Sequence, residues 1–267
     1  MTDPEPLISS HPFAATRATA DRLRYVVLVD EPICAWGNER HFLMGGVGFG
    51  ACIDALENAT GLPTIFASAQ FISFATVGET VELAVELPAQ GRTITQGRVV
   101  ASVGDRDVLR VTAALGGRDA ELDRSWGAMP DVPPPMECPL RPVDHPGITS
   151  IHTVLEDRTV PSPHAGATGT SCKWMRVPGH GETTASLLAF YADFLPRASA
   201  IATGEDFSRN SLDNVLRIHH VVPTEWVLIE TSISMVARGT FHGSSRLFAE
   251  DGTLLATANQ SGIARTR

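Results

Sequence analysis

The sequence predicts an α+β fold made of two similar units, each a long helix wrapped by an antiparallel sheet. Three observations support it: an internal repeat, strand-like alternation of apolar residues in both copies, and one helix candidate ahead of the strands in each copy. A repeat also explains the length of 267 residues, which is long for one ordinary domain and short for two unrelated ones. The apolar surfaces of helix and sheet would bury each other within each unit.

The repeat becomes visible when residues 72–116 are laid over residues 218–262. At this offset of 146 residues no gap is needed, and eight positions are identical. The agreement of turn signals is stronger support, because Gly104-Asp105-Arg106 falls over Glu250-Asp251-Gly252 and both stretches separate strand-like runs. We therefore expect the two segments to fold into the same set of strands.

The strand-like runs have a period of two residues. Alternate positions are apolar in both copies: Val81, Leu83, Val85 and Leu87 in the first, and Val227, Ile229 and Ile233 in the second. Such alternation predicts an antiparallel sheet with one buried and one solvated face. The spacing of the turns predicts about five long strands in each copy.

Each copy also has one helix candidate ahead of its strands. The first spans about residues 45–60, stops at Gly61, and carries apolar residues at helical spacing: Phe49, Cys52, Ile53 and Leu56. The second begins near Thr183 or Thr184, and we expect Pro196 to end or kink it.

The distribution of proline and glycine divides the chain. We predict a loose N-terminal segment over residues 1–23, a first repeat over 24–117 and a second repeat over 171–267. Residues 118–170 between them are rich in proline and are predicted to be a linker with little regular structure.

Composition and charge exclude several classes of protein. The net charge of −9 disfavours a nucleic-acid binder, and no apolar run approaches the roughly 20 residues of a membrane span. The acidic, proline-broken start does not resemble a signal peptide, so we expect a cytoplasmic protein with reduced thiols. No metal site is expected, because the four cysteines lack metal-ligand spacing: Cys34, Cys52, Cys138 and Cys172.

Four segments carry a resemblance to a known family. They are Phe42-Leu43-Met44-Gly45-Gly46, Ala189-Phe190-Tyr191-Ala192-Asp193, Ser211-Leu212-Asp213, and residues 237–262 with their closing Gln260-Ser261-Gly262. In these segments the chain resembles the type II (TesB-like) acyl-CoA thioesterases. The resemblance implies a double hotdog fold, two hotdog repeats in one chain, with the site on the second repeat.

The resemblance also implies an activity and three site residues. In that family an aspartate, a serine or threonine, and a glutamine position a hydrolytic water, and these correspond to Asp193, Ser211 and Gln260. The implied reaction is hydrolysis of acyl-CoA thioesters to a free fatty acid and CoA, without a cofactor. A homo-oligomer is expected, since hotdog sheets commonly pair edge to edge.

The residues themselves suit this chemistry. Asp193 lies among apolar helix residues, and a carboxylate in such surroundings tends to a raised pKa, as a general base requires. Direct attack of Asp193 on the thioester is the other route open to it. Asp213, two residues after Ser211, would share its strand face and is either part of the site or a surface carboxylate. In the first repeat the offset places Ala114 under Gln260, so one site per chain is expected.

Two alternative functions remain open, and one of them is motivated by departures from the family pattern. Ala192 replaces the usual serine before the aspartate, and Phe194 replaces the histidine usual after it. These changes motivate a non-catalytic acyl or acyl-CoA binding module of hotdog fold. A hotdog enoyl-CoA hydratase ranks lower, because that pattern needs a histidine a few residues after the aspartate. The low aromatic content, 6%, favours aliphatic acyl groups.

Overall fold

The main element of the structure is one twelve-stranded antiparallel sheet. The computed structural model describes residues 16–37, 39–118, 122–161, 165–180, 182–205 and 208–265. The first half of the sheet contains, in spatial order, β1 (Thr16–Ala18), β2 (Arg24–Leu28), β6 (Thr80–Gln90), β7 (Ile94–Val103), β8 (Arg106–Gly116) and β5 (Thr64–Phe71). The second half continues with β11 (Ser208–Ile218), β14 (Leu254–Arg265), β13 (Thr240–Ala249), β12 (Val227–Ala237), β10 (Thr170–Arg176) and β9 (Glu156–Thr159).

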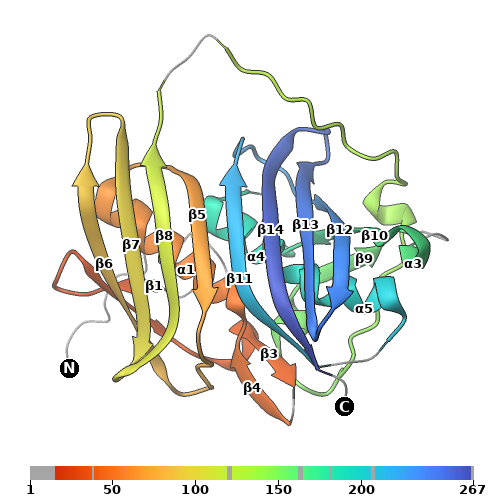
Figure 1. Ribbon diagram of the computed structural model, residues 1–267, viewed down its shortest axis with the longest axis horizontal. Coiled ribbons are helices and arrows are strands. Elements are labelled where there is room, and N and C mark those ends of the chain that lie inside the picture. The colour runs from red at the N-terminus through yellow and green to blue at the C-terminus, as the bar shows by residue number, and fades with distance from the viewer. Residues whose placement is uncertain are drawn as a thin grey trace.

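The two halves have the same strand order, mirrored about the junction at which β5 pairs with β11 (Figure 1). The predicted offset is confirmed at the strand level, because β7 and β13 are separated by 146 residues at both ends. Alternation is confirmed in β6, where Val81, Leu83 and Val85 are buried and Glu82 and Glu86 are exposed. The structure is therefore the predicted double hotdog.

The first helix, α1 (Gly45–Thr60), has the predicted bounds. Its chain reverses at Gly61, whose φ of +67° is the left-handed conformation that ends many helices. The second helix is broken into α4 (Ala185–Tyr191), a 3₁₀ turn η3 (Ala192–Phe194) and α5 (Leu195–Thr203). Thr184 caps α4 by accepting a hydrogen bond from the Leu187 N–H at 3.1 Å, as predicted.

The kink in the second helix corrects one expectation. The backbone leaves helical geometry at Asp193, where φ is −92° and ψ is +29°. Pro196 lies in the first turn of α5, a position that proline favours because no intrahelical N–H bond is lost there. The break therefore precedes the proline and coincides with the predicted site aspartate.

Helices α1 and α4 pack against each other through glycines. A Cβ atom at Gly50 would lie only 2.7 Å from the carbonyl oxygen of Ser186, and one at Gly46 only 2.7 Å from Cβ of Asp193. Both positions therefore require glycine for the helices to approach this closely. This contact places the start of α1 against the kink after α4.

The predicted linker, residues 118–170, is more structured than expected. It holds short elements η2 (Pro135–Glu137), α2 (Ile151–Val154) and α3 (Ala165–Thr168), and its strand β9 pairs with β10. Its proline-rich part crosses the outer face of the second half, where Trp174 Nε1 donates to the Pro133 carbonyl at 2.9 Å. Leu228 on that outer face is consequently buried.

The chain start and the smaller elements complete the fold. Residues 1–15 of the predicted loose segment, and residues 266–267 of the predicted second repeat, lie outside the described residues. Within the loose segment, β1 pairs with β2 and is therefore a strand. After the turn η1 (Glu31–Ile33), strands β3 (Cys34–Gly37) and β4 (Arg40–Leu43) form a separate hairpin ahead of α1. Among the described helices, none is long and apolar enough to cross a membrane.

Candidate active site

The three predicted site residues meet at the kink of the second helix. Asp193 is 7% exposed, and its Oδ2 accepts a hydrogen bond of 2.6 Å from the Gly46 N–H at the start of α1. Its Oδ1 accepts from Ser211 Oγ at 3.2 Å and from Gln260 Nε2. The carboxylate thus joins both helices to the sheet.

Neighbouring strands supply the two polar partners. Ser211 lies on β11 and Gln260 on β14, and Gln260 Nε2 also donates to Ser211 Oγ at 3.0 Å. Gln260 is 3% exposed, and its Oε1 has no hydrogen-bond partner among the described residues. The network therefore retains an acceptor beside the carboxylate.

A β-bulge overturns the expected orientation of Asp213. The pairing of β11 with β14 shifts between Ser211 and Asp213, so that Leu212 is an extra residue. Beyond the bulge the side chains change faces, and Asp213 accepts a hydrogen bond from the Ser261 N–H at 2.7 Å. Asp213 therefore anchors two strands and does not share the face of Ser211.

The same bulge brings a residue that sequence reasoning missed. Asn214 is fully buried, and its Nδ2 donates to the Ala192 carbonyl at 3.3 Å, one residue before the site aspartate. Regular alternation from Ser211 would have placed Asn214 on the opposite face. No local pattern predicts the bulge, so the sequence carried no signal for this contact.

The surroundings of Asp193 determine its acidity. Burial raises its pKa to about 6, while the hydrogen bonds from Gln260, Gly46 and Ser211 partly oppose that rise. The N-terminus of α1 also faces the carboxylate with the positive end of its dipole. The side chain is therefore ionised at neutral pH yet basic enough to accept a proton.

A large groove opens beside this network. Its volume is about 1090 Å³, and both Asp193 and Ser211 line it, whereas Gln260 does not. Aromatic residues form part of its wall: Trp36, Phe42, Phe71 and Phe74. Basic side chains lie along another part: His145, His152, Arg197 and Arg209. Acidic side chains also line it: Glu39, Asp144 and Glu205. The groove thus offers both apolar and charged surfaces near the carboxylate.

The strand pairing refines the comparison between the two repeats. Gly243 opposes Gln260 in the second half, and the equivalent Gly97 opposes Ala113 in the first, so the counterpart of Gln260 is Ala113 rather than Ala114. Both hairpins have a one-residue bulge at the equivalent place, and the turn after Ala249 is one residue longer than the turn after Val103, which explains the shift. Either alanine lacks the amide that the second repeat contributes.

Comparisons with known proteins agree with this fold. A family model described as the acyl-CoA thioesterase C-terminal domain matches residues 130–264. A provisionally named thioesterase from Novosphingobium aromaticivorans is 31% identical, with a TM-score of 0.86 over 96% of this chain and 100% of its own. No curated protein matches the chain.

Two more distant structures share the fold. An acyl-CoA thioesterase II from Mycobacterium marinum is 19% identical, with a TM-score of 0.74 over 94% of this chain and 96% of its own. A hot dog fold protein of unknown function from Alicyclobacillus acidocaldarius is 17% identical, with a TM-score of 0.82 over 93% of this chain and 96% of its own.

Proposed function

This chain belongs to the TesB-like acyl-CoA thioesterases and is a thioester hydrolase, and from that premise we propose how its site works. A water molecule is held by Asp193, Ser211 and Gln260 in the groove of the second repeat, next to the thioester carbonyl of an acyl-CoA. The observation that carries this proposal is the hydrogen-bonded contact of all three side chains at one buried carboxylate.

The proposed reaction begins when Asp193 removes a proton from the water. The water oxygen attacks the thioester carbon, and the carbonyl oxygen becomes an oxyanion. Collapse of this intermediate breaks the carbon–sulfur bond, and the CoA thiolate leaves with the proton that Asp193 had taken from the water. Ser211 and Gln260 orient the water and hold the carboxylate in place. The products are a free carboxylic acid and CoA.

We propose that the start of α1 stabilises the oxyanion. The N–H of Gly46 already donates to Asp193 and that of Val47 to the Met44 carbonyl, so the oxyanion would be held beside the N–H of Gly45, at the positive end of the dipole. Gly45 lines the groove, and a Cβ atom there would lie 2.9 Å from Asp193 Oδ2. Glycine at this position therefore leaves room for the reacting carbonyl beside the carboxylate.

The walls of the groove suit the two ends of an acyl-CoA. The aromatic side chains would contact the acyl chain, and Arg209 and His145 would face the CoA phosphates. Glu39, Asp144 and Glu205 also line the groove and the whole chain carries a net charge of −9, so these basic side chains would hold the phosphates against the overall field.

The direct test is the release of CoA thiol from acyl-CoAs of increasing chain length. The proposed mechanism expects turnover by the wild type and a loss of about 100-fold or more in kcat for Asp193→Asn. Full activity of that variant would place the site elsewhere, and binding without turnover by the wild type would favour a non-catalytic acyl-CoA binding module.

Isotope labelling of the water distinguishes whether Asp193 acts as a base or as a nucleophile. A single turnover in H₂¹⁸O places ¹⁸O in the acid if water attacks the thioester directly. If Asp193 attacks first, a mixed anhydride forms and the CoA thiolate leaves; when water opens the anhydride at the Asp193 carboxyl carbon, the first acid carries an ordinary oxygen and the ¹⁸O stays on Asp193. We propose the base route, because both carboxylate oxygens already accept hydrogen bonds.

Three further expectations remain proposals. Residues 24–117 and 171–267 would be two repeats with one site per chain, which a single equivalent of bound substrate analogue would support. The chain would form a homo-oligomer through a sheet edge such as β1, testable by light scattering. It would act in the cytoplasm, testable by fractionation.

A further inference from the structure

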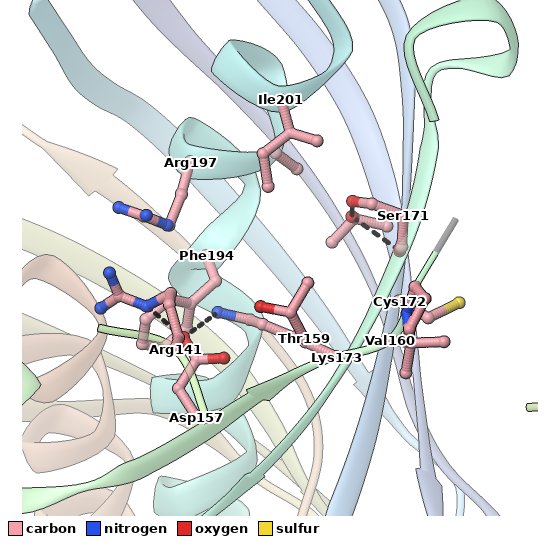
Figure 2. A pocket seen from close by; sticks show the side chains of 13 residues that line it. Arg141, Asp157, Thr159, Val160, Ser171, Cys172, Lys173, Phe194, Arg197 and Ile201 are labelled. Atoms are coloured by element: carbon pink, nitrogen blue, oxygen red, sulfur yellow. Dashed lines mark hydrogen bonds and ion pairs between the residues drawn. The ribbon is translucent and has the colours of Figure 1, made fainter. Parts of the chain in front are cut away.

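A second, smaller cavity lies within the second repeat. Its volume is about 140 Å³, and it is enclosed by α5, β9 and β10 (Figure 2). Phe194, Arg197 and Ile201 line this cavity and also line the groove that contains Asp193. The two spaces therefore adjoin at these three side chains.

The cavity contains Lys173, the only lysine of the sequence; the other 20 basic residues are arginines. Its side chain is 15% exposed, and its Nζ lies 3.6 Å from the centroid of the Phe194 ring. It shares a face of β10 with Met175, a fully buried residue of the main core. A lone lysine is thus placed in a position that usually holds an apolar side chain.

In the first repeat, the position equivalent to Lys173 is occupied by a different residue. Lys173 pairs with Ile229, and in the first repeat the equivalent Leu83 pairs with Tyr25. Tyr25 is 2% exposed, and its hydroxyl donates to the Arg22 carbonyl at 2.8 Å. An uncharged side chain with a local hydrogen bond completes the fold there, so packing alone does not require a lysine.

The charges around Lys173 do not balance. Its Nζ lies 3.5 Å from Asp157 Oδ2, but Arg141 Nε already donates to that oxygen at 3.0 Å. Three cations line the cavity, Arg141, Lys173 and Arg197. Two carboxylates face them: Asp157, and Asp144 outside the lining, which accepts from Arg197 at 3.0 Å and from Arg141 at 3.4 Å, so one positive charge is left over. Figure 2 shows the two dashed contacts converging on Asp157, with Arg197 and Ile201 reaching in from the helix.

The surplus of positive charge also lowers the pKa values of Lys173 and His152. Burial lowers the pKa of Lys173 to about 8, and Arg141 and Arg197 lower it further against the attraction of Asp157. Burial and the same three cations lower the pKa of the neighbouring His152 to about 4. An added anion would be stabilised in this field.

The remaining walls are largely apolar. The apolar part consists of Val160, Pro161, Phe194, Ala198 and Ile201, and the rest of the lining is Thr159, Ser171, Cys172 and Thr231. A fitting ligand therefore combines an aliphatic stem with an anionic end, and a free inorganic anion would leave these walls without a partner.

We infer that this cavity binds a carboxylate at the far end of the acyl group, so that the enzyme accepts ω-carboxyacyl-CoA thioesters. The inference rests on the proposed function: the thioester lies at Asp193, the chain passes Phe194, and the terminal carboxylate meets Lys173. An ordinary apolar acyl tunnel rejects such a charged end, because a buried carboxylate without a partner is strongly unfavourable.

The test compares matched pairs of substrates that differ only in the terminal group: adipyl-CoA with hexanoyl-CoA, suberyl-CoA with octanoyl-CoA, and sebacyl-CoA with decanoyl-CoA. The ratio of kcat/KM within a pair reports the preference for the carboxylate. At one chain length or more we expect a ratio above one, which falls about 10- to 100-fold in Lys173→Met. The control Arg98→Met removes a cation that is 55% exposed on β7 and leaves the ratio unchanged.

A second measurement needs no variant. Because the sequence has one lysine, ¹⁵N-lysine labelling gives a single side-chain NMR signal. A non-hydrolysable thioether analogue of the preferred ω-carboxyacyl-CoA should shift this signal, and the matched analogue with a methyl end should not. Equal shifts with both analogues would contradict the inference.

The outcomes separate this inference from the proposed function. Hydrolysis of plain acyl-CoAs with a ratio below one at every length, or a ratio unaffected by Lys173→Met, overturns the inference and leaves the thioesterase mechanism standing. Absence of any thioester hydrolysis overturns the mechanism and the inference with it. Lysine-dependent binding of free adipate without a substrate preference would assign the cavity to a free dicarboxylate instead, which also overturns it.

Discussion

Replacing Asp193 by asparagine removes a charge that folding buries, and should therefore stabilise the protein while it inactivates the enzyme. The asparagine amide can keep the hydrogen bonds of the site. Its oxygen can accept from the Gly46 N–H, and its NH₂ group can donate to Ser211 Oγ and to Gln260 Oε1, which has no partner among the described residues. The variant thus changes charge with little change in shape.

The magnitude follows from the acidity of the buried group. The ordinary pKa of an aspartate is 3.8, and burial raises that of Asp193 to about 6. Because the folded pKa lies above the unfolded one, the penalty is fully present above pH 6 and disappears as the pH falls towards 4. It amounts to about 3 kcal/mol at pH 8 and about half of that at pH 5. For 267 residues the larger figure corresponds to a rise of about 5 °C in Tm.

Differential scanning calorimetry of wild type and Asp193→Asn at pH 8 and pH 5 measures this difference, and the thiol-release assay reports activity. The matched control is Asp213→Asn, which weakens a hydrogen bond to the Ser261 N–H on the other face of the strand. The control should lower Tm at pH 8 and retain activity within a few-fold. A lower Tm for Asp193→Asn at pH 8, or an equal difference at both pH values, would refute the reasoning.

Three other predictions follow from the same structure. The kcat/KM of the wild type should fall about tenfold per pH unit below pH 6, since a protonated Asp193 cannot accept a proton from water; a flat profile would contradict a base of this pKa. Gly46→Ala should reduce kcat about 100-fold or more and lower Tm, because its Cβ atom would lie 2.7 Å from Asp193 Cβ. Gly147→Ala, with open space around the added atom, serves as its control, and equal effects of both variants would argue against the helix contact. Trypsin should cut first at the exposed Arg118 or Arg124, and the fragments should stay together through the β5–β11 pairing; separation without denaturant would contradict one continuous sheet.

Local and periodic features of the fold were readable from the sequence. The bounds of α1 follow from its apolar spacing and from Gly61, and strand β6 follows from the alternation of Val81, Leu83 and Val85. Both signals arise within a few neighbouring residues, where side-chain direction is fixed by the backbone period. The repeat then predicts the second half from the first without any long-range information.

The candidate site was readable only in part. Asp193, Ser211 and Gln260 were identified through their motifs, and the structure brings them into contact across 18 and 67 residues of sequence. Asp213 was assigned to the wrong face, since a single bulge at Leu212 inverts every later side chain of the strand. Such a bulge depends on the partner strand and leaves no periodic trace.

By itself, the sequence determined the repeated helix-and-sheet pattern, because periodicity is a local property of the chain, and its motifs singled out the three polar residues of the proposed site. Only the tertiary structure decided what surrounds them. The kink at Asp193, the covering of Leu228 by the proline-rich segment, and the enclosure of Lys173 beside Phe194 all depend on segments that meet after folding. The pKa values of Asp193 and Lys173 depend on burial and on neighbouring charges. Both come from residues far apart in the sequence, so they cannot be read from any one segment of the chain.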